Sequence, residues 1–343
     1  MIDLRSDTLT KPTPGMRKAM AAAEVGDDVF AEDPTVLELQ ASTAELFGHQ
    51  AGLMTVTGSM SNLLGVWSLV GAGQEIVCDL RAHIVRAELG AHAALHGVTT
   101  RTWESADGLV DAGRLAGIIA PDSGPYQVST AAVELENTHN FGGGTVYPLE
   151  TIKAIRELCL GAGVKMHLDG ARIWNAHVAT GVPLAEYGKC FDTVSVCFSK
   201  GLGAPIGSML LSDAETIARA RIQRKRLGGG WRQAGVLAAA VGYALDHHID
   251  RLADDNAAAQ AFALEVAALA PTAVDAEKVA TNIVVLDSGK ASAGSVVEQA
   301  AAAGVRLSAV GAKAVRAVTH LDVTHQQCVR AGQIVGEILA AVS

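Results

Sequence analysis

The sequence predicts an α/β protein that is built on a largely parallel sheet. Short apolar segments that end in polar or glycine-rich turns alternate with longer helical segments, which is the pattern of repeated strand–helix–strand units. The chain has 343 residues, and 49% of them are hydrophobic. We therefore expect about two domains with well-packed interiors.

Six segments in the first two thirds of the chain have the length and composition of strands, namely 51–56, 75–79, 131–135, 164–168, 193–198 and 206–211. Helices are expected at 60–70, at 148–161 and over most of 213–270. Two further strands, 282–286 and 315–320, lie among helical stretches. They predict a smaller α+β domain at the C-terminal end.

Charge and cysteine content exclude several classes of function. The 27 basic and 36 acidic residues give a formal charge of −9, whereas sequence-independent nucleic-acid binding relies on an excess of Lys and Arg. The five cysteines form no CxxC pair, and the helical pair His247 and His248 is expected to be exposed, so no metal site is predicted. No apolar run reaches the ~18 residues that span a bilayer, and the first residues lack the apolar region of a signal peptide. We expect a soluble, cytoplasmic protein that binds neither nucleic acid nor membrane.

Lys200 and Asp169 follow predicted strands in a way that indicates a cofactor site. Lys200 precedes two nearby glycines, and a lysine amine that is desolvated in a cleft is a good Schiff-base nucleophile. Asp169 ends a strand 31 residues earlier (200 − 169), a gap that suits one strand–helix–strand crossover. Pyridoxal phosphate (PLP) needs a lysine for its aldehyde and an acid for its ring nitrogen. A surface lysine and a helix N-cap aspartate are the ordinary alternatives.

Three other residues could complete such a site. Gly58 and Ser59 stand where a strand turns into a helix, and the free N–H groups of a helix N-terminus bind anions such as a phosphate. Many helices, however, simply start with Gly-Ser. His83 follows the strand 75–79 and could stack on a pyridine ring or move protons. A surface or hydrogen-bonded histidine is the more common outcome at such a position.

An amino-acid substrate would also need a group that binds its carboxylate. Arginine suits this role because its planar fork matches a carboxylate. Arg172 lies three residues after Asp169, Arg316 lies in the predicted strand 315–320, and Ser6 lies in the polar N-terminal segment. The sequence alone does not bring these three residues together.

Eight short motifs occur in the same order as in the L-threonine aldolases of the low-specificity type, and the chain resembles this family over nearly its whole length. The broader group includes aromatic amino-acid β-eliminating lyases. The motifs are DLRSDT at 3–8, GDDV at 26–29, EDPTV at 32–36, ENTHN at 136–140, HLDGARI at 167–173, SKGLG at 199–203, GGGWRQ at 228–233 and VTHLD at 318–322.

The resemblance implies a type I PLP fold with a mostly parallel, seven-stranded sheet. A large domain would span 16–250 and a small domain 251–343, with an N-terminal segment, 1–15, near the small domain. Lys200 would hold the cofactor, Asp169 would pair with its ring nitrogen, and His83 would cover the ring face. Gly58 and Ser59 would bind the phosphate.

The resemblance also implies the substrate site and the assembly. Ser6, Arg172 and Arg316 would hold the substrate carboxylate, and Arg172 could also contact the cofactor. The protein would be a homotetramer, a dimer of dimers with shared active sites. Lys225 and Arg232 would reach the neighbouring subunit's phosphate, and a basic helix end beside a glycine cap is the ordinary alternative.

The implied reaction is the reversible cleavage of L-threonine, L-allo-threonine and related L-β-hydroxy-α-amino acids to glycine and an aldehyde, which would serve glycine biosynthesis. One departure concerns Tyr126, which stands where close relatives carry a histidine associated with the substrate's β-hydroxyl. The isomer preference and the base are therefore open, with His83, a water or Tyr126 as candidates. The alternatives are another PLP lyase of the β-eliminating group and a non-catalytic PLP-binding protein. A nucleotide-binding protein is disfavoured, because the chain lacks a Walker motif and GxGxxG after the first strand.

Overall fold

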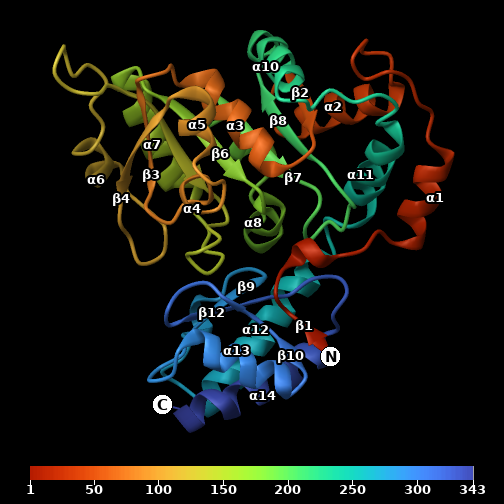
Figure 1. Cartoon of the computed structure of the whole chain (residues 1–343), viewed down its shortest axis with the longest axis vertical. Coiled ribbons are helices and arrows are strands. Elements are labelled where there is room, and N and C mark those ends of the chain that lie inside the picture. Colours follow the sequence, from red (N-terminus) through yellow and green to blue (C-terminus); the bar gives the residue numbers. More distant parts are fainter. Residues whose placement is uncertain (343) are drawn as a thin grey trace.

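A mostly parallel sheet forms the centre of the larger region in the computed structural model, which describes residues 1–342 (Figure 1). In this part of the chain its seven strands lie in the order β2 (Ala51–Thr55), β8 (Ser208–Ser212), β7 (Thr193–Cys197), β6 (Lys165–Gly170), β5 (Thr130–Glu136), β3 (Glu75–Asp79) and β4 (Thr99–Trp103). β8 runs antiparallel to both neighbours, and the other pairs are parallel. The predicted fold class is confirmed.

Side chains alternate between the two faces of this sheet, as the period of a strand requires. Leu53 and Leu210 pack with the helices α3 (Gly58–Leu69) and α10 (Ala214–Arg226). Their neighbours Met54 and Met209 belong to the larger core on the opposite face, with residues of α2 (Pro34–Leu46) and α7 (Leu149–Ala162). The sheet is therefore the middle of three layers.

The remaining helices of this region cover the sheet or its edges. They are α1 (Pro14–Ala22), α4 (His83–Arg86), α5 (Ala91–His96), α6 (Ala112–Ala116), α8 (Ile173–Thr180), α9 (Leu184–Gly188), α11 (Gly235–His247) and a short 3₁₀ turn η1 (Asp7–Leu9). Among residues 1–342, no helix has the length and apolar character that crossing a membrane requires.

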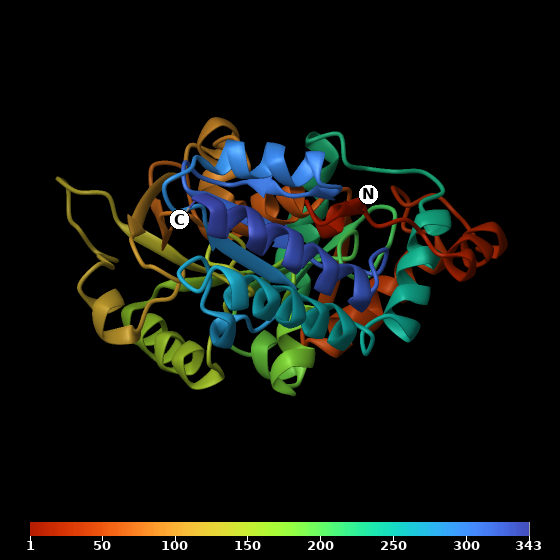
Figure 2. The ribbon, with the colours of Figure 1, turned by 90° about the horizontal axis from the view of Figure 1, so that it is seen from below.

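The smaller region has its own sheet and its own hydrophobic core. The strands β11 (Ser308–Ala309), β12 (Ala314–Val318) and β9 (Ile283–Asp287) form an antiparallel sheet in that order. Its helices are α12 (Leu252–Leu269), η2 (Ala276–Lys278), α13 (Ala293–Ala302) and α14 (His325–Val342). α12 and α14 pack along each other, as Figure 2 shows.

The N-terminal segment joins the smaller region. β1 (Ile2–Asp3) pairs in parallel with β10 (Val305–Arg306), and Leu4 belongs to the core of the smaller region. The chain then runs across to α1, whose Met16 lies in the large core. We propose that the segments 1–15, 16–250 and 251–343 form the arm, the large domain and the small domain.

Candidate active site

A cavity of about 330 Å³ opens at the carboxyl ends of the central strands, and four of the eight predicted cofactor residues line it. Gly58, Ser59, His83 and Lys200 all line it. The other lining residues come from the N-terminal segment, from the start of α3 and from the loop after β7, and they are Thr8, Thr10, Val56, Thr57, Cys197, Ser199, Ala204, Pro205 and Ile206. Segments that lie 190 residues apart in sequence thus meet, since Thr10 Oγ1 donates to the Lys200 carbonyl at 2.9 Å.

The start of α3 forms one wall of this cavity. Thr57 caps the helix by accepting a hydrogen bond from the Met60 N–H, which leaves other N–H groups of the first turn available to an anion. A Cβ on Gly58 would lie 2.6 Å from Cys197 Sγ, so this position accepts only glycine without a shift of its surroundings. The backbone here can approach a phosphate closely.

Lys200 follows β7 and places its amine in the cavity. Its Nζ lies 3.6 Å from Cys197 Sγ, and within residues 1–342 no carboxylate forms an ion pair with it. The side chain is half-buried. An amine in this setting is available to an aldehyde.

Asp169 lies one strand away from β7, at the end of β6. Its Oδ2 accepts from Asn62 Nδ2 at 2.7 Å, and its Oδ1 accepts from the Ala171 N–H at 3.1 Å. Burial alone would raise the pKa of this carboxyl, but the positive charges of His83 and Lys200 outweigh that effect and lower it. Asp169 is therefore a buried anion, as a partner for a protonated ring nitrogen must be.

Asn62 connects Asp169 to His83. The same Nδ2 donates to Glu88 Oε1 at 2.9 Å, and Glu88 Oε1 also lies 2.9 Å from His83 Nδ1. Asn62 Oδ1 must then accept from His167 Nε2, 3.2 Å away, which fixes the tautomer of that ring. Burial lowers the pKa of His167 to about 4, so this ring is neutral.

His83 is the ionisable ring that lines the cavity. Burial works to lower its pKa, but the hydrogen bond to Glu88 and the charge of Asp169 raise it overall. Its backbone N–H donates to Glu136 Oε2 at 2.8 Å. With Nδ1 engaged by Glu88, Nε2 is the nitrogen at which His83 can exchange a proton.

The predicted carboxylate-binding arginines lie together between the two regions. Arg172 makes a two-pronged ion pair with Asp7, in which Nε and Nη2 each donate at 2.7 Å. Although burial opposes it, the charge of Arg172 lowers the pKa of Asp7 to about 2. Arg172 and Arg316 both donate to Asn140 Oδ1, at 3.2 and 2.7 Å.

Arg316 differs from Arg172 because no carboxylate of the described chain forms an ion pair with it, and its Nε has no hydrogen-bond partner there. Burial and the nearby Arg172 charge lower the pKa of Arg316 to about 10. This guanidinium is therefore charged and incompletely neutralised. It is the better placed of the two arginines to receive a carboxylate from outside.

Seven of the predicted site residues do not line this cavity, namely Asp169, Arg172, Arg316, Ser6, Tyr126, Lys225 and Arg232. Ser6 bonds locally to Thr8, and Lys225 and Arg232 are exposed, with Arg232 paired to Asp27 at 2.9 Å. Tyr126 is 94% exposed in a loop before β5. Any role of the last three in catalysis would need a second subunit.

Sequence reasoning missed several residues that organise the site, namely Asp7, Asn62, Glu88, Glu136 and Asn140. Three of them lie inside recognised motifs, which was the available signal. One expectation was wrong: His248 is buried, and its Nδ1 lies 2.7 Å from the carbonyl of Leu202 in the loop after Lys200.

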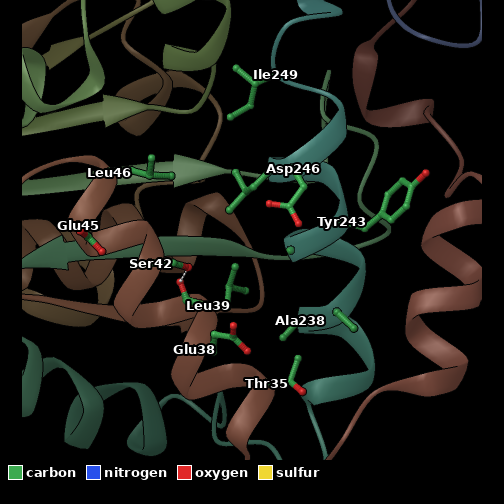
Figure 3. Close-up of a pocket in the computed structure, with 13 residues that line it drawn as sticks. Thr35, Glu38, Leu39, Ser42, Glu45, Leu46, Ala238, Tyr243, Asp246 and Ile249 are labelled. Carbon is green, nitrogen blue, oxygen red and sulfur yellow. Dashed lines mark hydrogen bonds between the residues drawn. The ribbon is translucent and has the colours of Figure 1, made fainter.

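A larger cavity, of about 680 Å³, lies elsewhere, between α2 and α11 (Figure 3). It shares no residue with the Lys200 cavity. Its charged lining consists of Glu38, Glu45 and Asp246, all acidic, and it contains no lysine. Size alone therefore does not mark the active site.

The mostly parallel sheet with its flanking helices and the connected smaller region have the type I fold of PLP-dependent enzymes. Within that class, the family described as beta-eliminating lyase matches residues 3–288, and the chain belongs to this family. A low specificity L-threonine aldolase of Escherichia coli is 40% identical over 330 residues, which cover 95% of this chain and 96% of that protein. A probable low-specificity L-threonine aldolase 2 of Arabidopsis thaliana is 42% identical over 291 residues, 83% of this chain and 81% of that one.

Solved structures support the same fold at much lower identity. A threonine aldolase of Leishmania major has a TM-score of 0.85 at 17% identity and covers 99% of this chain, with all of that chain matched. A serine palmitoyltransferase of Sphingomonas wittichii has a TM-score of 0.74 at 16% identity, covering 100% and 88% of the two chains. The predicted family and the assignment to the lyases are confirmed.

Proposed function

We propose that this chain is a PLP-dependent aldolase that cleaves L-threonine, L-allo-threonine and related L-β-hydroxy-α-amino acids to glycine and an aldehyde. The observation that supports this proposal most directly is the arrangement of Lys200 and Asp169. They place an available amine and a buried anion at the ends of adjacent parallel strands. The relatives named as low-specificity L-threonine aldolases, about 40% identical over most of their length, support the substrate class.

The site fits PLP through its donor set. Lys200 would hold the aldehyde, Asp169 the ring N–H, and the start of α3 at Gly58 and Ser59 the phosphate. When bound, PLP supplies an electron sink that accepts the electron pair of the broken Cα–Cβ bond. A buried anion that is rigidly held, such as Asp169, suits this chemistry because it needs no rearrangement as charge develops on the ring.

The chain's own residues perform the remaining tasks. Arg316, with Arg172 and Ser6 nearby, binds and orients the substrate carboxylate. His83 would cover the ring face of the bound cofactor and exchange a proton at Nε2, because Glu88 holds Nδ1. Although burial opposes it, the hydrogen bond to Glu88 and the charge of Asp169 raise the pKa of His83, which favours the protonated ring that can donate a proton.

A kinetic assay on the four threonine stereoisomers tests this function, with acetaldehyde coupled to its reduction and glycine measured separately. We expect turnover of L-threonine and L-allo-threonine and none of the D-isomers. Release of ammonia from tryptophan or tyrosine, without cleavage of β-hydroxy amino acids, would instead support another lyase of the β-eliminating group, which the family description favours as the second candidate. Borohydride reduction and peptide mapping should place the pyridoxyl label on Lys200, and a label elsewhere would overturn the site.

We further propose a cytoplasmic homotetramer, a dimer of dimers, that contributes to glycine formation. Lys225 and Arg232 are exposed, and Gly229 between them lies against Met60 of α3, so these side chains would be available to a neighbouring subunit's phosphate. Light scattering after size exclusion tests the tetramer. Mixing inactive Lys200→Ala with a Lys225→Ala/Arg232→Ala double variant should restore activity if sites are shared, and no recovery in mixed oligomers would contradict sharing.

A further inference from the structure

One fully buried carboxyl, that of Glu134, lies beside the proposed site but has no assigned role. Glu134 is 0% exposed, and neither side-chain oxygen has a hydrogen-bond partner within residues 1–342. The alternation along β5 places Glu134 and Glu136 on the face with Ala132, which packs against α3 residues, while Val133 and Leu135 join the opposite core. Buried carboxyls without partners are rare and call for an explanation.

Other carboxylates surround this group. The carboxyl oxygens of Glu134, Glu136 and Asp169 come within 4.8 Å of one another. Asp79 of β3 and Glu88 add negative charge from two more directions. The strand register places His167 of β6 opposite Glu134, but that ring is neutral. The two histidines with raised pKa pair with other members of the cluster: His139 Nε2 lies 3.3 Å from Asp79 and 3.9 Å from Glu136, and His83 Nδ1 lies 2.9 Å from Glu88. Within residues 1–342 no cation forms an ion pair with Glu134 itself.

Hydrogen-bond donors distinguish Glu134 from its two neighbours. Glu136 accepts from the Asn140 N–H at 2.7 Å and from the His83 N–H at 2.8 Å. Asp169 accepts from Asn62 and Ala171. Donors stabilise the ionised form of a carboxyl, so a proton shared by the cluster settles on the member that has none. Burial, followed by the charges of its neighbours, accordingly raises the pKa of Glu134 well above its ordinary value.

We propose that Glu134 is a protonated, neutral carboxylic acid in the working enzyme, and that it is a positioning residue which keeps Asp169 anionic beneath the cofactor ring. The inference rests on the proposed function through the role given to Asp169. A third negative charge in the cluster would favour protonation of Asp169 and remove the anion that the ring nitrogen requires. The proton on Glu134 prevents this.

Infrared spectroscopy of the holoenzyme tests the protonation directly. We expect a carboxylic-acid C=O band at neutral pH that Glu134→Gln reduces. The matched control is Thr43→Val, which also removes a buried, unpartnered polar group but lies on α2 outside the cluster, and it should retain the band. An unchanged band in Glu134→Gln would overturn the proposal.

Stability against pH gives a second readout that does not depend on catalysis. A raised folded-state pKa means that the stabilisation is complete below the unfolded value and is lost as the pH rises through the folded one. The fall of the urea midpoint between about pH 5 and about pH 9 should therefore be smaller in Glu134→Gln than in wild type. An equal fall in both proteins would count against a titrating Glu134.

The positioning role is tested on the cofactor's absorption spectrum. An alkaline spectral transition of the wild type should shift or disappear in Glu134→Gln and persist in Thr43→Val. If the infrared band is lost but the spectral titration is unchanged, Glu134 is protonated without positioning Asp169, and the proposal fails. A stoichiometric metal ion, detected by native mass spectrometry and absent from Glu134→Gln, would assign the cluster to a cation instead. Absence of aldehyde from threonine with the infrared result intact would refute the proposed activity alone.

Discussion

Two hydrogen-bonded networks flank Lys200, and they have opposite charge. The network on the sheet contains Asp169, Glu88 and Asn62, with His83 as its ionisable base. The network between the two regions contains two arginines and one acid, Asp7. All residues of the first network lie in the larger region. The second network combines residues of the N-terminal segment, the larger region and the smaller region.

We propose that this difference suits a zwitterionic amino acid. The negative network would stabilise positive charge on a ring nitrogen, and the positive network would attract a carboxylate. The positive network also has an internal division, because Asp7 neutralises Arg172 and leaves Arg316 with spare charge. Each network, and each arginine, can be altered separately.

Removing Lys200 should have the largest effect on activity, because Lys200 lies between the two networks and would hold the cofactor. We expect Lys200→Ala to lower kcat/KM for L-threonine by about 10³-fold or more, since no other amine lines the cavity in the described chain. Thermal stability should change little, because the side chain is half-buried. Exposed Lys18→Ala is the control. Activity retained at about a tenth of wild type would contradict a covalent role.

Breaking the ion pair between Asp7 and Arg172 should lower the stability of the protein. Asp7→Asn leaves Arg172 buried and unpaired, and we expect a loss of about 3–5 kcal/mol in the free energy of unfolding at pH 7. In the wild type, the lowered pKa of Asp7 means that its stabilisation is present above the ordinary value of 3.8 and is lost as the pH falls through about 2.

Urea unfolding measures this loss, with Asp3→Asn as the matched control. Asp3 pairs with Arg5 on the same N-terminal arm, but both side chains are partly exposed, so that pair should contribute only about 0–1 kcal/mol. Equal losses in the two variants would mean that burial does not distinguish the two ion pairs.

Removing the unneutralised arginine should instead affect substrate binding. We expect Arg316→Gln to raise the KM for L-threonine roughly 100-fold, with a smaller change in kcat, because a charge-assisted contact to the carboxylate is lost. Stability should change little, since no ion pair is broken. Exposed Arg306→Gln in the small region is the control. An unchanged KM would mean that Arg172, and not Arg316, binds the substrate carboxylate.

The negative network should respond to an added charge with a shift in pH dependence. Asn62→Asp places a carboxyl between Asp169 and Glu88, which raises the pKa of Asp169 by repulsion. The acid limb of kcat/KM should move to higher pH, and the value near pH 7 should fall about tenfold. Asn175→Asp, at a buried position of α8, is the control. An acid limb that stays in place would show that Asp169 does not control it.

The sequence predicted the parts of the site that sheet geometry determines. Lys200 and Asp169 follow adjacent strands of a parallel sheet, so their spacing was sufficient to place them at one edge. The edge strand β4 was missed because its residues, TTRTW, form no apolar run and are mostly exposed or half-buried. Periodicity detects burial, and an edge strand has little of it.

Contacts between distant segments had no comparable signal. Asp7 and Arg172 are 165 residues apart, and Asn140 and Arg316 are 176 apart. The residues next to Asp7, Arg172, Asn140 or Arg316 in sequence do not indicate such a partner, because the pairing depends on how the two regions pack together. Asn62 lies in an apolar helix, where a single polar residue has no distinctive pattern. These residues required the three-dimensional structure.

Tyr126 belongs to neither network, and its substitution should have the smallest effect. It is 94% exposed in its own chain, so we propose that any contact with the substrate side chain is made in the cavity of a second subunit. Tyr126→His should then change the ratio of kcat/KM for L-allo-threonine over L-threonine by about threefold, which is the value of one modest hydrogen bond. Val128→His in the same loop is the control and should leave this ratio unchanged. If both variants leave it unchanged, Tyr126 remains in solvent in the assembled enzyme, and the isomer preference is determined by residues that line the cavity itself.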